Sequence, residues 1–216
     1  MKKLIICLEL LFLTGMLSAQ APKFIRLLPP NTDRGISVMK ALSLRSSTTD
    51  WDTAGLILQD LSDLAWSANG MNRRETGKRT APSALNAQDI DLYILLKSGI
   101  YIYDAAEHLL NLVAEGDFRD LAAGSQPEAA QAPVICLMVS DISRFNAGEE
   151  DQRLEWAAID AGTVSQNIAL FCASEGFATR PRVTMDKGNL RKILKLKDSQ
   201  YLILNNPVSY NKVTDN

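Results

Sequence analysis

Histidine and cysteine are scarce in this chain of 216 residues, which contains 1 histidine and 3 cysteines. A hydrolytic triad that uses histidine, or a zinc site built from histidine and cysteine, would have too few residues to draw on. The motifs G-x-G-x-x-G, G-x-x-x-x-G-K-[ST] and G-x-S-x-G are also missing from the sequence, which argues against common nucleotide sites and serine hydrolases. We therefore expect no metal site and interpret His108 as a surface or half-buried side chain.

The charge balance lacks an excess of either sign, with Lys+Arg 23 against Asp+Glu 25 and a formal net charge of -2. A nucleic-acid-binding protein needs a basic face to release phosphate counterions, so no nucleic-acid partner is expected. The hydrophobic share of 46% and the charged share of 22% are typical of a globular protein. A chain of this length can bury a sufficient core without disulfide or metal support.

The first residues have the organisation of an export signal. Two lysines precede a mostly apolar stretch, residues 4–17, and small residues follow it. The stretch contains Glu9 and is shorter than the ~20 residues of a membrane-spanning helix. We predict a secretory signal peptide over residues 1–21 that is removed, which leaves a single exported, periplasmic domain over residues 22–216 with no membrane span.

Two cysteines, Cys136 and Cys172, remain after this removal, and each lies in an apolar run. An oxidising compartment would allow them to pair. The small, apolar character of cysteine favours buried free thiols instead, although the pattern does not decide between the two states.

Periodicity and turn residues predict both helices and strands. Helical spacing of apolar residues predicts a short helix over residues 35–44, a helix capped by Asp52 or Thr53 that ends near Gly70, a long helix over 150–175 followed by Gly176, and a helix over 186–194. β-rich runs predict a hairpin over 90–96 and 100–103, an apolar segment over 108–113, a buried central strand over 133–139 and a last strand over 201–205. This mixture predicts an α+β fold, a mixed sheet with helices packed on it.

The long predicted helix carries small residues in its middle, which would let another helix approach closely. These residues are Ala157, Ala158, Ala161, Gly162 and Ser165. Two interpretations are open, a central dimer helix and ordinary packing against the core.

Three polar segments interrupt the apolar pattern with hydrogen-bond donors. Residues 45–47, Arg-Ser-Ser, suit a phosphate because a guanidinium and hydroxyls can form charge-assisted bonds. Residues 80–88 offer hydroxyl and amide groups suited to a polar ring or ribityl chain, and residues 176–181 expose backbone amides after the long helix. Each segment could also be an ordinary cap or turn, because serine, asparagine and proline are turn residues.

Four segments of the chain, taken in their order, resemble the nitroreductase family. The resemblance rests on residues 45–47, 66–73, 77–88 and 160–168, and it covers about residues 38–210. The greatest similarity is to the branch that includes azoline-oxidising (thiazole- or oxazole-forming) dehydrogenases. It implies a mainly antiparallel central sheet flanked by helices, and an intertwined homodimer that holds one FMN per active site at the subunit interface.

The resemblance also implies a set of FMN contacts, carried over residue by residue. The phosphate and ribityl contacts would be Arg45, Ser46, Ser47 and Thr49, the segment lent by the other protomer would be Pro82, Ser83, Ala84 and Asn86, and the ring contacts would be Gln126, Pro181, Val183 and Thr184. A main-chain N–H of the last segment would contact flavin N5. Arg79 and Arg180 are candidate cations near flavin N1 and O2.

Two departures from the family pattern affect the phosphate end. Thr49 stands where the family often has a basic residue, and residues 208–211 read Val-Ser-Tyr-Asn instead of Val-Gly-Tyr-Pro. Lys212 is a candidate substitute for a basic phosphate ligand.

The implied function is an FMN-dependent oxidoreductase that transfers hydride through flavin N5 to or from an unknown small molecule. The cofactor supplies the difficult chemistry, so no catalytic side chain is required. Because NAD(P)H is a cytosolic metabolite, export would imply an oxidative role or an electron donor of the cell envelope. The alternatives are a non-catalytic periplasmic dimer that binds flavin or an aromatic ligand, and a structural protein without a cofactor.

Overall fold

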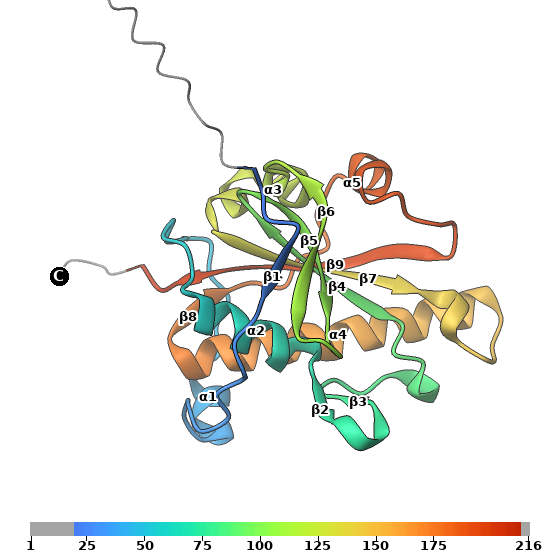
Figure 1. The fold of residues 1–216 in the computed structure, drawn as a ribbon, viewed down its shortest axis with the longest axis horizontal. Coiled ribbons are helices and arrows are strands. Elements are labelled where there is room, and N and C mark those ends of the chain that lie inside the picture. The colour runs from blue at the N-terminus through green and yellow to red at the C-terminus, as the bar shows by residue number, and fades with distance from the viewer. Residues whose placement is uncertain (1–19, 213–216) are drawn as a thin grey trace, which may run out of the picture.

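The computed structural model describes residues 20–212 (Figure 1). The predicted signal peptide, residues 1–21, lies outside the described residues except for its last two positions. Within the described part, no helix combines the length and hydropathy needed to cross a bilayer.

Seven strands form one sheet in the order β1-β6-β5-β4-β7-β9-β8. Every described pairing in it is antiparallel, so the α+β prediction is confirmed and the sheet is antiparallel throughout rather than mixed. The strands are β1 (Phe24–Arg26), β4 (Ile90–Leu96), β5 (Gly99–Asp104), β6 (Leu109–Glu115), β7 (Val134–Asp141), β8 (Phe177–Thr179) and β9 (Gln200–Tyr210), and a separate hairpin joins β2 (Met71–Arg73) to β3 (Lys78–Arg79).

Helices cover both faces of the sheet (Figure 1). They are α1 (Val38–Leu44), α2 (Leu58–Asn69), α3 (Arg119–Ala123), α4 (Glu150–Glu175) and α5 (Lys187–Leu194). Alternate residues of β4 point to opposite faces, as a strand requires. Leu92 and Ile94 pack in the core with α2 and α4, whereas Tyr93 and Leu95 pack in the core with α3 and α5. Because both faces are covered, long parts of β4 and β7, residues 92–96 and 134–139, are continuously apolar.

Two predicted elements have different bounds in the structure. The second helix begins at Leu58, with Ile57 at its N-cap and no side-chain cap. Asp52 instead accepts a hydrogen bond from Ala54 N–H in a turn. The last strand extends to Tyr210, beyond the predicted end at 205, because β7 and β8 pair with it on either side.

The long helix has the predicted bounds, and Gly176 caps it in the left-handed region with φ of 72°. Its small residues divide between two sides. Ala157 and Ala161 are buried against the body of the protein, whereas Ala158 is exposed and Gly162 is half-buried. The buried small residues therefore pack in the core, and Ala158 and Gly162 leave the outer side of the helix without bulky side chains at these positions.

The single histidine is buried, so its predicted surface or half-buried position is wrong. His108 is 8% exposed, and its two ring nitrogens contact Tyr103 Oη and the Leu28 carbonyl oxygen, each at 2.8 Å. Because a carbonyl only accepts, Nε2–H donates to Leu28 and Nδ1 accepts from Tyr103. Burial lowers the pKa of His108, which keeps the ring neutral.

Both cysteines among residues 20–212 are buried free thiols. Cys136 lies on β7 and Cys172 on α4. Burial raises the pKa of Cys136 to about 12, so this thiol is un-ionised and behaves as a small apolar side chain.

Candidate functional site

The first predicted segment, residues 45–49, follows α1 and lies beside the end of α4. Thr48 N–H donates to the Thr179 carbonyl oxygen at 3.2 Å, and Lys212 Nζ contacts Asp50 Oδ1 at 2.7 Å. The segment therefore lies next to β8 and next to Lys212, the predicted substitute cation. The four predicted phosphate contacts are exposed: Arg45, Ser46, Ser47 and Thr49.

A groove of about 320 Å³ adjoins this segment. Ser46, Ser47 and Thr48 form one wall, and the end of α4 with β8 forms the other. The hydroxyl groups of this wall, with the Arg45 guanidinium before them and Lys212 next to Asp50, form a donor-rich surface that suits an anion.

The predicted ring contacts follow β8. Pro181 and Val183 are exposed and Thr184 is half-buried. Between them, the N–H and C=O of Arg182 exchange hydrogen bonds of 2.8 Å with the C=O and N–H of Asn205. This bridge fixes the backbone of the segment to β9. In the described part of the chain, the N–H groups of Val183 and Thr184 donate to no protein atom.

Gln126, the fourth predicted ring contact, is joined to this segment by a side chain that the sequence did not reveal. Arg182 Nε donates to Gln126 Oε1 at 2.8 Å, and Arg182 Nη1 donates to Asn205 Oδ1 at 2.9 Å. The Asn205 amide in turn donates to the Thr184 carbonyl oxygen at 3.0 Å. Arg182 thus connects two predicted ring contacts that lie far apart in the sequence.

The guanidinium of Arg182 is buried, and Arg182 is 5% exposed. It also donates to the carbonyl oxygens of Ala122 and Ala123. Among residues 20–212, no carboxylate lies within ion-pair distance of it. Burial, and then the neighbouring Arg180 guanidinium, lower the pKa of Arg182.

The turn before Gln126 packs closely on the 182–185 segment. Gly124 has φ of 57°, and a Cβ on it would lie 3.0 Å from Met185 Cα. Asp186 N–H donates to the Leu121 carbonyl oxygen at 2.7 Å. A larger residue than glycine at position 124 would push the two ring segments apart.

The third predicted group, residues 82–86, is fixed to the middle of α4. Thr163 Oγ1 donates to the Pro82 carbonyl oxygen at 3.2 Å, and Ala84 N–H donates to the Asp160 carboxylate at 2.8 Å. Pro82 and Asn86 are exposed, and Ser83 is half-buried. The loop therefore presents its residues outward from a firm base.

Within one chain this loop does not meet the other two groups. Asp160 and Cys172, which lines the groove beside residues 45–49, are separated along α4 by about 18 Å at a rise of about 1.5 Å per residue. Figure 1 shows α1 at the end of α4 that leads into β8, whereas β3, which the loop follows, lies nearer the middle of α4. One chain thus places residues 45–49 beside β8, joins Gln126 to the segment that follows β8, and keeps residues 82–86 apart, at the middle of α4.

The two candidate cations have different surroundings. Arg79 Nη1 donates to the Asn69 carbonyl oxygen at 3.0 Å, and Arg79 Nε donates to Gln88 Oε1 at 3.1 Å. Arg79 thus joins the two ends of the segment over residues 69–88, which contains the 82–86 loop. Arg180 is half-buried and lies beside Arg182, with the ring contacts.

A buried carboxyl pair lies beneath the 82–86 loop. Asp89 is 0% exposed, its Oδ2 accepts a hydrogen bond from Ser140 Oγ, and its Oδ1 has no hydrogen-bond partner. Burial, together with the neighbouring Asp160 carboxylate, raises the pKa of Asp89 to about 7. Asp89 therefore keeps its proton in the folded chain up to about neutral pH.

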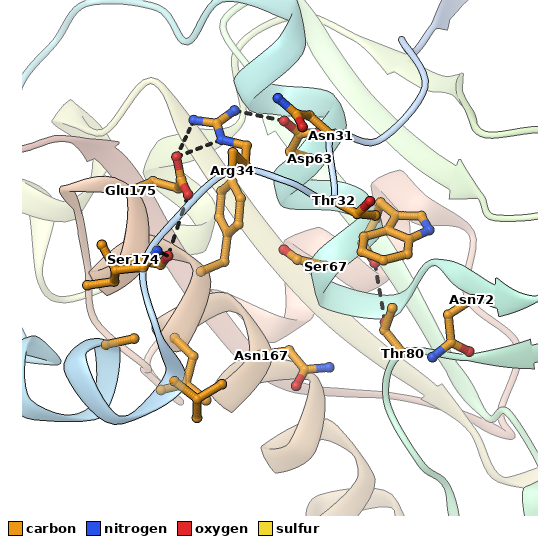
Figure 2. A pocket seen from close by; sticks show the side chains of 16 residues that line it. Asn31, Thr32, Arg34, Asp63, Ser67, Asn72, Thr80, Asn167, Ser174 and Glu175 are labelled. Atoms are coloured by element: carbon orange, nitrogen blue, oxygen red, sulfur yellow. Dashed lines mark hydrogen bonds and ion pairs between the residues drawn. The ribbon is translucent and has the colours of Figure 1, made fainter.

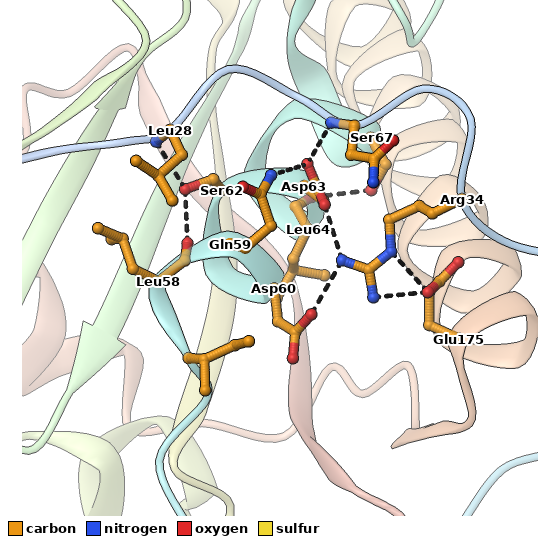
Figure 3. A network of polar contacts seen from close by, with 12 residues as sticks. Leu28, Arg34, Leu58, Gln59, Asp60, Ser62, Asp63, Leu64, Ser67 and Glu175 are labelled. Carbon is orange, nitrogen blue, oxygen red and sulfur yellow. Dashed lines mark hydrogen bonds and ion pairs between the residues drawn. The ribbon is translucent and has the colours of Figure 1, made fainter.

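A second cavity of about 400 Å³ lies between residues 31–41, α2 and α4 (Figure 2). Arg34 lies at its edge and is part of a polar network (Figure 3). Its guanidinium contacts Asp63 at 2.7 Å, Asp60 at 2.9 Å and Glu175. The network fastens the N-terminal segment across α2 and α4, which fixes the start of α1 and hence the segment at 45–49.

The chain is similar to known proteins in sequence and in fold. The chain matches the model of the Nitroreductase family over residues 45–208. It is 30% identical to a protein from Ralstonia eutropha that is provisionally named a nitroreductase, whose crystal structure superimposes with a TM-score of 0.83 over 90% of this chain and 92% of that chain. A protein from Methanocaldococcus jannaschii, also provisionally named a nitroreductase, is 25% identical over 178 residues, 78% of this chain and 89% of the relative. A nitroreductase family protein from Clostridium difficile, 15% identical, shares the fold with a TM-score of 0.60 over 84% of this chain and 88% of that chain.

Proposed function

Because the chain belongs to the nitroreductase family, we propose that it is an FMN-dependent oxidoreductase of the nitroreductase type. The observations that carry the proposal are that residues 45–49 lie beside β8 through Thr48 N–H and the Thr179 carbonyl oxygen, and that Arg182, in the segment after β8, holds Gln126. Within the family, residues 66–73 and 77–88 favour the branch that includes azoline-oxidising dehydrogenases.

The residues present fit FMN in chemical type. Exposed hydroxyls and the Arg45 guanidinium suit its phosphate, with Lys212 as a second cation beside them. The free N–H groups of Val183 and Thr184 suit acceptors on the ring. When bound, FMN would supply two-electron transfer as hydride through N5, between a reduced donor and an oxidised acceptor molecule. The protein's own residues would hold the phosphate and orient the ring.

We further propose that two copies complete the site. The outward side of α4 carries Ile159, which is 57% exposed, and exposed Gln166. An antiparallel copy of α4 related by a two-fold axis near Gln166 would place Asp160 of one copy opposite Cys172 of the other. This places the 82–86 loop of each copy beside residues 45–49 of the other, which removes the separation of about 18 Å.

The surface around α1 supports a second copy as the occupant. Val38 and Met39, at the start of α1, are 66% and 76% exposed. A contiguous apolar surface of this kind marks an interaction site. Its position next to residues 45–49 places it at the edge of the same proposed interface.

Export, and with it an electron donor of the cell envelope, is also proposed. It rests on the sequence of residues 1–21 alone.

The test is the visible spectrum of the chain over residues 22–216, purified after the addition of FMN. We expect flavin bands that remain after desalting and that bleach on reduction. Ser47→Ala should weaken FMN binding by about 10- to 100-fold, because a hydrogen bond to a charged group contributes about 1.5–3 kcal/mol. Ser43→Ala is the matched control, because Ser43 is also exposed and its hydroxyl donates to the Lys40 carbonyl oxygen within α1. A colourless protein that takes up no flavin would refute the proposal.

A further inference from the structure

The contact between Arg182 and Gln126 determines which way the glutamine amide points. A guanidinium carries only donors, so only the amide oxygen of Gln126 can face it. Oε1 accepts from Arg182 Nε at 2.8 Å, which leaves the Nε2 hydrogens directed elsewhere. Gln126 as a whole is half-buried. The end of Gln126 that is turned away from Arg182 therefore presents hydrogen-bond donors.

The second feature is the buried positive charge behind this donor, which no carboxylate among residues 20–212 contacts, although the more distant Glu128 carboxylate opposes the lowering of the Arg182 pKa. Arg182 is 5% exposed, and its bonds go to carbonyl oxygens and amides. A buried cation without a carboxylate partner is costly, and it favours negative charge in its surroundings. Arg180 lies beside it and adds to the positive potential.

Resting on the proposed function, we propose that Arg182 is a positioning residue that fixes Gln126 as a hydrogen-bond donor to an acceptor atom of bound FMN. The donor and the buried cation together favour the reduced flavin, which takes up negative charge that the oxidised flavin lacks. Through Asn205, the same guanidinium also holds the 182–184 backbone against which the ring would lie. Arg182 would thus set both the orientation of the ring and its midpoint potential.

The experiment measures the dissociation constant of oxidised FMN and the midpoint potential of the bound flavin, by equilibration with redox dyes. Gln126→Leu removes the donor and leaves Arg182 in place. We expect reduced FMN to be weakened about tenfold relative to oxidised FMN, which lowers the two-electron midpoint potential by about 30 mV. Arg182→Met should lower the midpoint potential at least as far. Arg182→Lys should give a potential between those of Arg182→Met and the native chain, because lysine keeps the positive charge but lacks the planar set of guanidinium donors.

Arg191→Met is the matched control. Arg191 also holds backbone carbonyl oxygens, those of Gln200 and Lys197, each at 2.7 Å, but on α5. Its loss should leave the potential unchanged. If Arg182→Met does not fold, Gln126→Leu decides the question alone.

The outcomes separate this inference from the proposed function. A native chain that binds FMN, with a Gln126→Leu variant of the same potential, overturns the role of Arg182 and Gln126 while the proposed function stands. A potential lowered equally in Arg191→Met also overturns it, since the effect would then be a general loss of packing. A native chain that binds no FMN overturns the proposed function itself.

Discussion

The buried carboxyl Asp89 makes the stability of this protein depend on pH in a defined direction. Asp89 is 0% exposed, one of its oxygens has no hydrogen-bond partner, and Asp160 lies beside it. The substitution Asp89→Asn replaces the carboxyl with a neutral group of the same shape. The new amide still accepts from Ser140 Oγ and can donate toward Asp160.

The magnitude follows from the pKa of Asp89, which burial and Asp160 raise from 3.8 to about 7. Between these values the folded chain keeps a proton that the unfolded chain has lost. The free energy of unfolding therefore falls as pH rises through this window, by up to about 1.4 kcal/mol per pH unit. Over the whole window the loss amounts to about 4 kcal/mol, and above pH 7 it levels off.

The assay is urea unfolding followed by circular dichroism at pH 4, 6 and 8, at one protein concentration. We expect Asp89→Asn to match the native chain at pH 4 and to exceed it progressively toward pH 8. Asp33→Asn is the control, because it removes the same charge at an exposed position. Equal pH dependence in the native chain and Asp89→Asn would refute the reasoning.

Two further substitutions test the interface and the N-terminal network. Ile159→Asp places a charge on the outer side of α4 and should shift the chain from dimer to monomer in sedimentation equilibrium. Gln152→Asp, which adds a charge at an exposed position near the start of α4, should leave the dimer unchanged. A dimer that Ile159→Asp does not affect would contradict the proposed pairing. Arg34→Met leaves three carboxylates without their shared cation and should lower the free energy of unfolding by about 2–4 kcal/mol in urea. Lys40→Met, at an exposed position of α1, should change it little, and equal effects of the two would contradict the role of Arg34.

Long elements with a clear pattern were predicted from the sequence. The apolar run at 133–139 is the buried strand β7, and residues 90–103 form the predicted hairpin. The long helix ends at Gly176 because glycine adopts the left-handed cap at no steric cost. Asp186 caps α5 through its side chain, which accepts from Asn189 N–H.

Short elements and buried polar residues were missed. β1 and β8 have three residues each, too few for a period to be visible, and they form only because longer strands offer an edge to pair with. His108 was predicted at or near the surface, but Tyr103 and Leu28 satisfy its nitrogens in the interior. Such partners come from other elements, so no local signal announces them.

The sequence by itself determined the family pattern and the residue types of the predicted site, because the phosphate and ring segments are short and local. Only the tertiary structure decided which of these segments meet. The strands bring Gln126 and residues 181–184 onto one guanidinium, Arg182, which belongs to no motif. The length of α4 keeps residues 82–86 away from them, because a rigid helix fixes the distance between whatever packs on its middle and on its end.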